Sequence, residues 1–284
     1  MDEAKDVSSR VPRVLAVAGT DPTGGAGIQA DLKSIAAHGG YGMAVVTALV
    51  AQNTRGVRAV HVPPPEFLAA QLRAVSDDVT IDAVKLGMLH SAPLVEVVAA
   101  WLDDVRPPVV VLDPVLAATS TTGPGGGRLF DTASTAALRA MCSRVHLVTP
   151  NLPELAVLVG ETEAQGWDAA VGQARRLAGR TGATVLVKGG HLGGEDSPDA
   201  IVRPDDAAPV RTVPGRRVDS TSTHGTGCSL SSAVATLAAT GLPWVEALSR
   251  AKAWLAGAIE QGAVLDVGSG RGPVDHFHHL RGMG

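Results

Sequence analysis

The sequence contains only two cysteines, Cys142 and Cys228, and no cysteine pairs at metal-binding spacing. A disulfide-rich scaffold and a zinc site built on cysteine pairs are therefore excluded. An excess of one sign of charge is also missing. The chain has 24 Lys and Arg residues and 28 Asp and Glu residues, so its net charge is −4, and it has no dense basic run. This balance favours neither nucleic acid nor an anionic membrane as a partner, so a small molecule is expected.

Long hydrophobic runs are missing as well. No uninterrupted apolar stretch reaches the roughly 18 residues that a membrane span requires, and the first ten residues, MDEAKDVSSR, lack the apolar centre of a signal peptide. We therefore expect a cytoplasmic protein. Residues 1–10 are expected to form a flexible tail, because they offer little apolar surface for docking, and residues 11–284 to form one domain.

Short apolar, β-branched runs instead alternate with longer segments of helical period. Strands are predicted at residues 13–19, 43–51, 82–89, 109–115, 144–150 and 184–190, and helices at residues 28–36, 66–75, 94–102, 170–179, 229–239 and 245–260. The predicted strands are continuously apolar, which is typical of strands buried on both faces of a parallel sheet. The fold class is therefore predicted as α/β, with a mostly parallel central sheet covered by helices on both faces.

A glycine-rich turn, AGTDPTGGAG at residues 18–27, joins the first predicted strand to the first predicted helix. Its glycines lack the spacing of the dinucleotide fingerprint G-x-G-x-x-G, and no Lys-Ser or Lys-Thr pair follows them as in a P-loop. Two interpretations stay open. The turn either lets the backbone approach a ligand, with Asp21 as a hydrogen-bond acceptor, or serves helix packing alone.

A second glycine turn lies in STHGTGCSLSSAV, residues 222–234. Gly225 and Gly227 present backbone N–H groups at the start of an apolar helix, which predicts an anion hole at the positive end of the helix dipole. Cys228 lies in the first turn of that helix, where the dipole is expected to lower the thiol pKa and favour a base or a nucleophile. The alternative is a small buried residue in a tight helix start.

Charged and polar side chains stand where several predicted strands end. Asn151 and Glu154 in TPNLPE are one helical turn apart, which suits either a hydrated Mg²⁺ or the capping of the helix that they begin. Asp113 and Lys188 end apolar strands, so the lysine either neutralises a phosphate or pairs with an aspartate. Gln52, after another strand, either reads ring nitrogens or closes a turn.

Three further segments carry weaker signals. The Gly- and Thr-rich stretch at residues 117–128 and the stretch at residues 192–199 follow strand ends and are predicted as flexible loops, each either a lid or a mere connection. His276, His278 and His279 lack the partner spacing of a zinc site, so we expect them at the surface.

These groups together are what phosphoryl transfer requires: an anion hole, a metal site, a phosphate-binding lysine and an acceptor for the hydroxyl proton. Seven motifs, in the order AGTDPTGGAGIQADLK, ALVAQNT, KLGML, LDPV, TPNLPE, VKGGH and THGTGCSLS, resemble the hydroxymethylpyrimidine/phosphomethylpyrimidine kinases of thiamine biosynthesis, within the ribokinase-like superfamily. The resemblance runs from about residue 13 to residue 280.

The resemblance implies a ribokinase-like three-layer sandwich, commonly dimeric, and therefore a homodimer. It also implies a MgATP-dependent enzyme that phosphorylates 4-amino-5-hydroxymethyl-2-methylpyrimidine and then its monophosphate to the pyrophosphate. A need for a monovalent cation stays open.

The matching motifs carry the family's site residues to positions in this chain. Six are placed around the pyrimidine: Gly19, Asp21, Ala26, Gln52, Met88 and Val115. Thr226, Gly227 and Cys228 form the anion hole, with Cys228 as the catalytic base and Gly225 as a further catalytic residue, and Thr226 and Gly227 also bind phosphate. Four serve the nucleotide, the first three by holding Mg²⁺ and its waters and the last by facing the phosphates: Asp113, Asn151, Glu154 and Lys188.

Two alternative functions stay open. A pyridoxal kinase on the same scaffold, or an enzyme with both activities, is the nearest, and the choice of ring would depend on Gln52 and Met88. A non-catalytic pyrimidine-binding regulator is the alternative of another class. It is expected to lack Cys228, Lys188 or Asp113, and all three are present.

Overall fold

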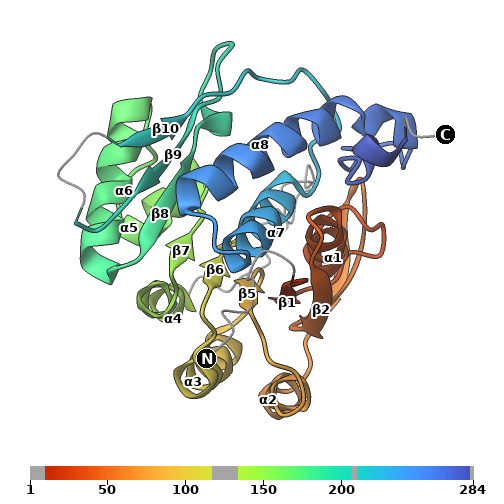
Figure 1. Cartoon of the computed structure of the whole chain (residues 1–284), viewed down its shortest axis with the longest axis vertical. Coiled ribbons are helices and arrows are strands. Elements are labelled where there is room, and N and C mark those ends of the chain that lie inside the picture. Colours follow the sequence, from red (N-terminus) through yellow and green to blue (C-terminus); the bar gives the residue numbers. More distant parts are fainter. Residues whose placement is uncertain (1–9, 117–133, 206–209, 282–284) are drawn as a thin grey trace, which may run out of the picture.

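The computed structural model describes residues 10–116, 134–205 and 210–281 (Figure 1). The predicted tail at residues 1–10 lies outside this part of the chain except for Arg10, and the predicted loop at residues 117–128 lies outside it entirely. The division into a tail and one domain therefore stays a prediction.

One eight-stranded sheet, in the order β10-β9-β8-β7-β6-β5-β1-β2, forms the centre of the fold. Its strands are β1 (Arg13–Ala18), β2 (Tyr41–Val46), β5 (Ala83–Leu86), β6 (Val110–Leu112), β7 (Leu147–Val148), β8 (Thr184–Lys188), β9 (Asp199–Val202) and β10 (Arg211–Val213). All neighbouring strands from β2 to β8 pair in parallel, whereas β9 pairs antiparallel with both β8 and β10. The predicted, mostly parallel sheet is confirmed.

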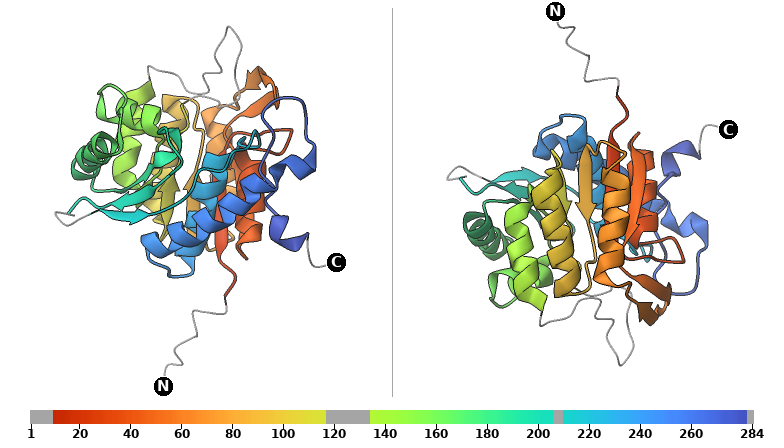
Figure 2. Two further views of the ribbon diagram at one scale, coloured as in Figure 1. Left: turned by 90° about the horizontal axis from the view of Figure 1, so that it is seen from above. Right: turned by 90° about the horizontal axis from the view of Figure 1, so that it is seen from below.

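Helices cover both faces of this sheet, as Figure 2 shows from above and below. In β1, Leu15 and Val17 pack into the core on one face, and Val14 and Ala16 into the core on the other. The first face is covered by α2 (Pro65–Ser76), α3 (Ala92–Val105), α4 (Thr135–Met141), α5 (Leu152–Val159) and α6 (Trp167–Thr181). The second is covered by α1 (Gly27–Ala37), α7 (Thr226–Ala239) and α8 (Trp244–Glu260). Continuously apolar strands need this double cover.

The single strand predicted at residues 43–51 is wrong. The chain leaves the main sheet after β2, and β3 (Leu49–Asn53) pairs antiparallel with β4 (Gly56–His61) in a separate two-stranded sheet. Thr47 fixes the corner, because its hydroxyl donates a 2.6 Å hydrogen bond to the carbonyl of Met88. The apolar run continues across this corner with Thr47 as its one polar residue, so the break was not predicted.

The stretch at residues 192–199 is an irregular segment before β9 with exposed residues at 193–196, so the predicted surface loop is confirmed, and its flexibility stays a prediction. Arg217 donates to the backbone carbonyls of Gly190, Leu192 and Gly194. Asp199, the last residue of the stretch, is buried at the start of β9. Among the described helices, none is both long and apolar enough to cross a membrane.

Candidate active site

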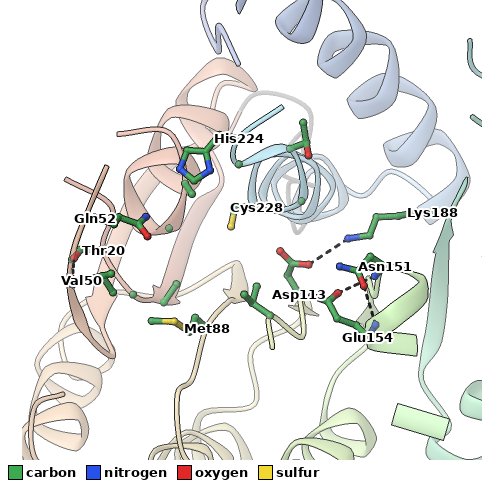
Figure 3. A pocket seen from close by; sticks show the side chains of 18 residues that line it. Thr20, Val50, Gln52, Met88, Asp113, Asn151, Glu154, Lys188, His224 and Cys228 are labelled. Carbon is green, nitrogen blue, oxygen red and sulfur yellow. Dashed lines mark hydrogen bonds and ion pairs between the residues drawn. The ribbon is translucent and has the colours of Figure 1, made fainter. Parts of the chain in front are cut away.

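The carboxyl ends of β1, β5, β6, β7 and β8 meet the first turns of α1, α5 and α7 around one open cavity (Figure 3). Its empty space is about 770 Å³, including open solvent at the mouth. All the site residues predicted from the motifs line it except Asp21: Gly19, Ala26, Gln52, Met88, Asp113, Val115, Asn151, Glu154, Lys188, Gly225, Thr226, Gly227 and Cys228.

Asp21 lies behind the glycine turn, fully buried, instead of facing the cavity. Its carboxylate accepts hydrogen bonds from the backbone N–H groups of Thr23, Gly25 and Ala26 and from the Thr23 hydroxyl. It also bonds Nε2 of His224 at 2.8 Å. Burial opposes its ionisation, but the hydrogen bonds from His224 and Thr23 hold the pKa of Asp21 well below its usual range. Asp21 therefore shapes the turn and does not itself line the cavity.

The two glycine turns are packed against each other. Gly225 has φ 81°, which favours glycine, and a Cβ added there would overlap the carbonyl oxygen of Gly25. At the entrance to α1, Gly27 has φ 56°, and a Cβ on it would overlap the carbonyl oxygen of Gly19. The close approach of backbone to backbone explains the glycines. Gly27 and Gly225 therefore allow the turns to pack closely and also form part of the cavity wall.

The cavity has an apolar end formed by β3 and the segments after β1, β5 and β6. Val50, Met88 and Val115 line it, together with the amide of Gln52. Gly19 lies directly beside Met88, because a Cβ at Gly19 would overlap the methyl carbon of that side chain. This end offers apolar faces for a flat ring and one amide that both donates and accepts.

The opposite end is a polar wall. The ammonium of Lys188 lies 3.5 Å from Oδ1 of Asp113, so the predicted strand-end charges form an ion pair inside the cavity. Asn151 and Glu154 form a capping box at the start of α5, with both backbone-to-side-chain bonds at 2.9 Å. Burial raises the pKa of Glu154 to about 7, with the charge of Asp113 adding to the effect and Lys188 opposing it.

The anion hole lies next to this wall. A Cβ added at Gly227 would lie 3.5 Å from Oδ2 of Asp113 and 3.7 Å from the ammonium of Lys188. The first backbone N–H groups of a helix have no partner within it, so the start of α7 faces the same space as the lysine. The predicted anion hole and phosphate-binding lysine are thus brought together.

The expected lowering of the thiol pKa is wrong. Burial raises the pKa of Cys228 to about 12, and the carboxylates of Asp31 and Asp113 add to the rise. The ammonium of Lys85 and the N–H of Gly27 oppose it. A helix dipole contributes a modest stabilisation at its first turn, which here is smaller than the cost of burying a thiolate.

The donor set of the polar wall fits a hydrated Mg²⁺. No cluster of three or more His, Cys, Asp or Glu side chains placed to hold a metal occurs within residues 10–116, 134–205 and 210–281. Asp113 and Glu154 nevertheless supply two neighbouring carboxylates, and Mg²⁺ usually takes one or two carboxylates together with waters and substrate phosphates.

Several residues in or beneath the cavity wall were not predicted from the sequence. His224 lines the cavity and precedes Gly225 in a motif already singled out, and Val50 lies two residues before Gln52 on the same strand, which is the period of one strand face. Lys85 and Asp31 form a fully buried ion pair at 2.7 Å beneath the cavity. A lysine inside an apolar strand was the available signal for that pair.

The histidine-rich segment also differs from expectation. His276 is buried, not at the surface, and its Nε2 lies 2.9 Å from the hydroxyl of Ser229. Burial lowers the pKa of His276 to about 4. Its ring packs near Trp254 of α8, so the segment anchors the C-terminal part of the chain against α7 and α8.

A cavity that joins an apolar end to phosphate-binding groups, on this three-layer sheet, defines a small-molecule kinase with the ribokinase-like fold. A family model described as phosphomethylpyrimidine kinase matches residues 21–275. The chain belongs to the phosphomethylpyrimidine kinase family.

The names of related proteins agree with this family. The hydroxymethylpyrimidine/phosphomethylpyrimidine kinase of Escherichia coli is 46% identical over 265 residues, covering 93% of this chain and 97% of that protein. The thiamine biosynthesis multifunctional protein ThiED of Corynebacterium efficiens is 56% identical over 266 residues, or 94% of this chain. The chain spans 35% of that longer protein and of its Corynebacterium glutamicum counterpart.

Solved structures show the same fold. The ADP complex of Bacillus subtilis pyridoxal kinase superposes with a TM-score of 0.82 at 30% identity, covering 96% of this chain and 99% of that one. Phosphomethylpyrimidine kinase from Clostridium difficile superposes with a TM-score of 0.73 at 32% identity, covering 88% of this chain and 100% of that one.

Proposed function

We propose that this chain uses ATP to phosphorylate 4-amino-5-hydroxymethyl-2-methylpyrimidine and then its monophosphate, yielding the pyrophosphate used in thiamine biosynthesis. The observation that carries the proposal is the single cavity in which the apolar end around Gln52 and Met88 opens onto the anion hole at Gly227. The name of the E. coli relative supports both steps, and the name of the family supports the second.

The pyrimidine would bind at the apolar end. Met88, Val50 and Val115 cover the faces of the ring, and the amide of Gln52 both donates to a ring nitrogen and accepts from the amino group. The neighbouring glycines leave room for the ring against the backbone. This placement directs the hydroxymethyl group toward Cys228 and the start of α7.

The phosphates would bind at the polar wall. Lys188 neutralises phosphate charge, and the N–H groups at Thr226 and Gly227 hold the group being transferred. Asp113, Asn151 and Glu154 would hold Mg²⁺ and its waters, and that ion supplies charge neutralisation of the phosphates when bound. Phosphoryl transfer passes through a loose transition state, so positioning and electrostatics supply most of the acceleration.

Cys228 is proposed as the acceptor of the hydroxyl proton. Because burial raises its pKa to about 12, the thiol of the free protein is protonated and must ionise before it takes that proton. Replacing Cys228 with Ala is expected to lower turnover by about 100-fold or more, the usual contribution of a general base, while ligand binding is retained. Unchanged turnover in that variant removes Cys228 from the role.

Solved relatives support ATP as the phosphoryl donor. The pyridoxal kinases of B. subtilis and Staphylococcus aureus have structures with ADP, and the latter also with AMP-PCP. The homodimer and the cytoplasmic location stay predictions.

The proposal is tested by measuring ADP release with MgATP against hydroxymethylpyrimidine, its monophosphate and pyridoxal in separate assays. Turnover on both pyrimidines is expected. Pyridoxal is included because the pyridoxal kinase of B. subtilis superposes on almost the whole chain. Turnover on pyridoxal alone contradicts the proposal and assigns the alternative activity, and turnover on all three assigns both. Absence of turnover in folded protein favours a binding module.

A further inference from the structure

Lys85 and Asp31 form an ion pair that no cavity contact explains. Both side chains are fully buried, and the Nζ to Oδ1 distance is 2.7 Å. Ser232 of α7 donates to the same oxygen of Asp31 at 2.8 Å, and the second carboxylate oxygen, Oδ2, has no partner among the described residues. Replacing a buried ion pair with apolar residues is often neutral or stabilising, so stability alone is a weak reason for this pair.

The pair lies one helical turn behind Cys228. On α7, Ser232 follows Cys228 by four residues, and on α1, Asp31 follows Gly27 by four residues, so each pair shares one face of its helix. The N–H of Gly27 is directed at the sulfur of Cys228, while Ser232 bonds Asp31. The two helices therefore run side by side with matched contacts one turn apart.

Lys85 links this pair to the cavity floor. A Cβ added at Gly87 would lie 2.9 Å from the ammonium of Lys85, and the next residue, Met88, lines the cavity. Ser232, one helical turn after Cys228, thus connects to Lys85 of β5 through Asp31 of α1, and Asp113 lies beside the neighbouring Gly227. The charge of Lys85 lowers the pKa of the thiol, and the two carboxylates raise it. Because Lys85 and Asp31 are fully buried, solvent screens their charges only weakly.

We propose that Lys85 is a positioning residue that favours ionisation of the Cys228 thiol, with Asp31 holding its ammonium in place and limiting that effect. This inference rests on the proposed function for the purpose of the ionisation, although the electrostatic relationship itself is independent of substrate. Two variants that break the same ion pair, one at each partner, should therefore shift the pKa of the Cys228 thiol in opposite directions.

The test is the rate of alkylation of Cys228 by iodoacetamide at pH 8. A Cys142→Ala background leaves Cys228 as the only thiol, because the chain has two cysteines. We expect Lys85→Met to slow alkylation at least threefold and Asp31→Asn to accelerate it by a similar factor. These factors correspond to a change of about one unit in the thiol pKa, since a less acidic thiol forms a more nucleophilic thiolate.

Lys252→Met is the matched control. Lys252 of α8 pairs with Asp199 of β9 at 2.5 Å, neither residue lines the cavity, and the loss of Lys252 is expected to leave the alkylation rate unchanged. If Lys85→Met fails to fold, as judged by circular dichroism, Asp31→Asn decides alone. Rates that shift in the same direction in both variants, or an Asp31→Asn rate that is unchanged or slower, overturn the proposal. Alkylation needs no kinase turnover, so this result stands apart from the activity assays.

Discussion

Asp21 and His224 are bonded at 2.8 Å across the seam between the two glycine turns, although 203 residues separate them in the chain. The contact fastens the turn at the start of α1 to the turn at the start of α7. The relative position of the apolar end and the anion hole therefore depends on one buried carboxylate that touches neither ligand site directly.

Asp21→Asn is expected to destabilise the protein by about 2–4 kcal/mol. The amide nitrogen of asparagine cannot accept the hydrogen bonds that the carboxylate accepts, so buried N–H donors lose their partner. The free energy of unfolding in urea measures the effect. Asp104→Asn, at an exposed position of α3, is the control and should change it by less than about 0.5 kcal/mol. A similarly small effect at Asp21 would show that the seam tolerates its loss.

The same carboxylate predicts an acid-sensitive stability. The folded pKa of Asp21 lies below its unfolded value, so its contribution is complete above the unfolded pKa and is lost as pH falls below about 4. Unfolding free energies between pH 7 and pH 3 should fall less steeply in Asp21→Asn than in the parent protein. Parallel curves would contradict the assignment.

Gly225 and Gly227 should respond differently to alanine. Gly225→Ala forces a left-handed backbone and an overlap with the Gly25 carbonyl, so a loss of several kcal/mol in stability is expected. Gly227→Ala meets only ordinary contacts and lies within α7, so stability is kept or rises by up to about 1 kcal/mol. Its methyl group enters the proposed phosphate site, and turnover should fall at least about tenfold.

Thermal unfolding and kinase assays of the two glycine variants give the check. A Gly227→Ala protein with full stability and full turnover would exclude the start of α7 as the phosphate site. Loss of stability in that variant would instead mean that the helix start has no room for a methyl group.

Glu154→Gln should stabilise the metal-free protein at pH 8. The folded pKa of Glu154 is raised from 4.5 to about 7, so the native state keeps a proton that the unfolded chain releases, and stability falls as pH rises through that window. Glutamine removes this loss, worth about 1–3 kcal/mol, and still completes a capping box.

Unfolding free energies at pH 5 and pH 8 test this prediction. The gain from Glu154→Gln should be larger at pH 8 than at pH 5, where the glutamate is already protonated. Equal gains at both values would mean that the carboxyl group is not held neutral in the folded protein. Turnover of the variant should fall despite its higher stability, because one proposed Mg²⁺ ligand is lost.

The sequence located most of the cavity because parallel strands deliver their last residues to one edge. Asp113, Lys188 and Asn151 follow three such strands, and their position needed no knowledge of side-chain packing. The seam bond between Asp21 and His224 joins two loops that are distant in the chain. Residue type and spacing carry no signal for such a pairing.

The errors arose where tertiary burial outweighed a local rule. The helix dipole at Cys228 is a first-turn effect, whereas desolvation depends on what α1 and β5 place around the sulfur. The run at residues 43–51 is apolar except for Thr47, and the bond from Thr47 to Met88 marks where the chain bends. His276 is polar by type but finds a buried partner in Ser229.

The seam between the glycine turns also bears on how the protein is made. A chain emerging from the ribosome completes the turn at residues 18–27 early, yet the start of α7 follows only after His224, 203 positions beyond Asp21. Until then the first turn has no opposite wall, and contacts of such long sequence separation slow folding. The complete cavity is thus acquired late, and a nascent fragment that ends before α7 lacks the N–H groups proposed to hold the transferred phosphoryl group, although it already contains Lys188.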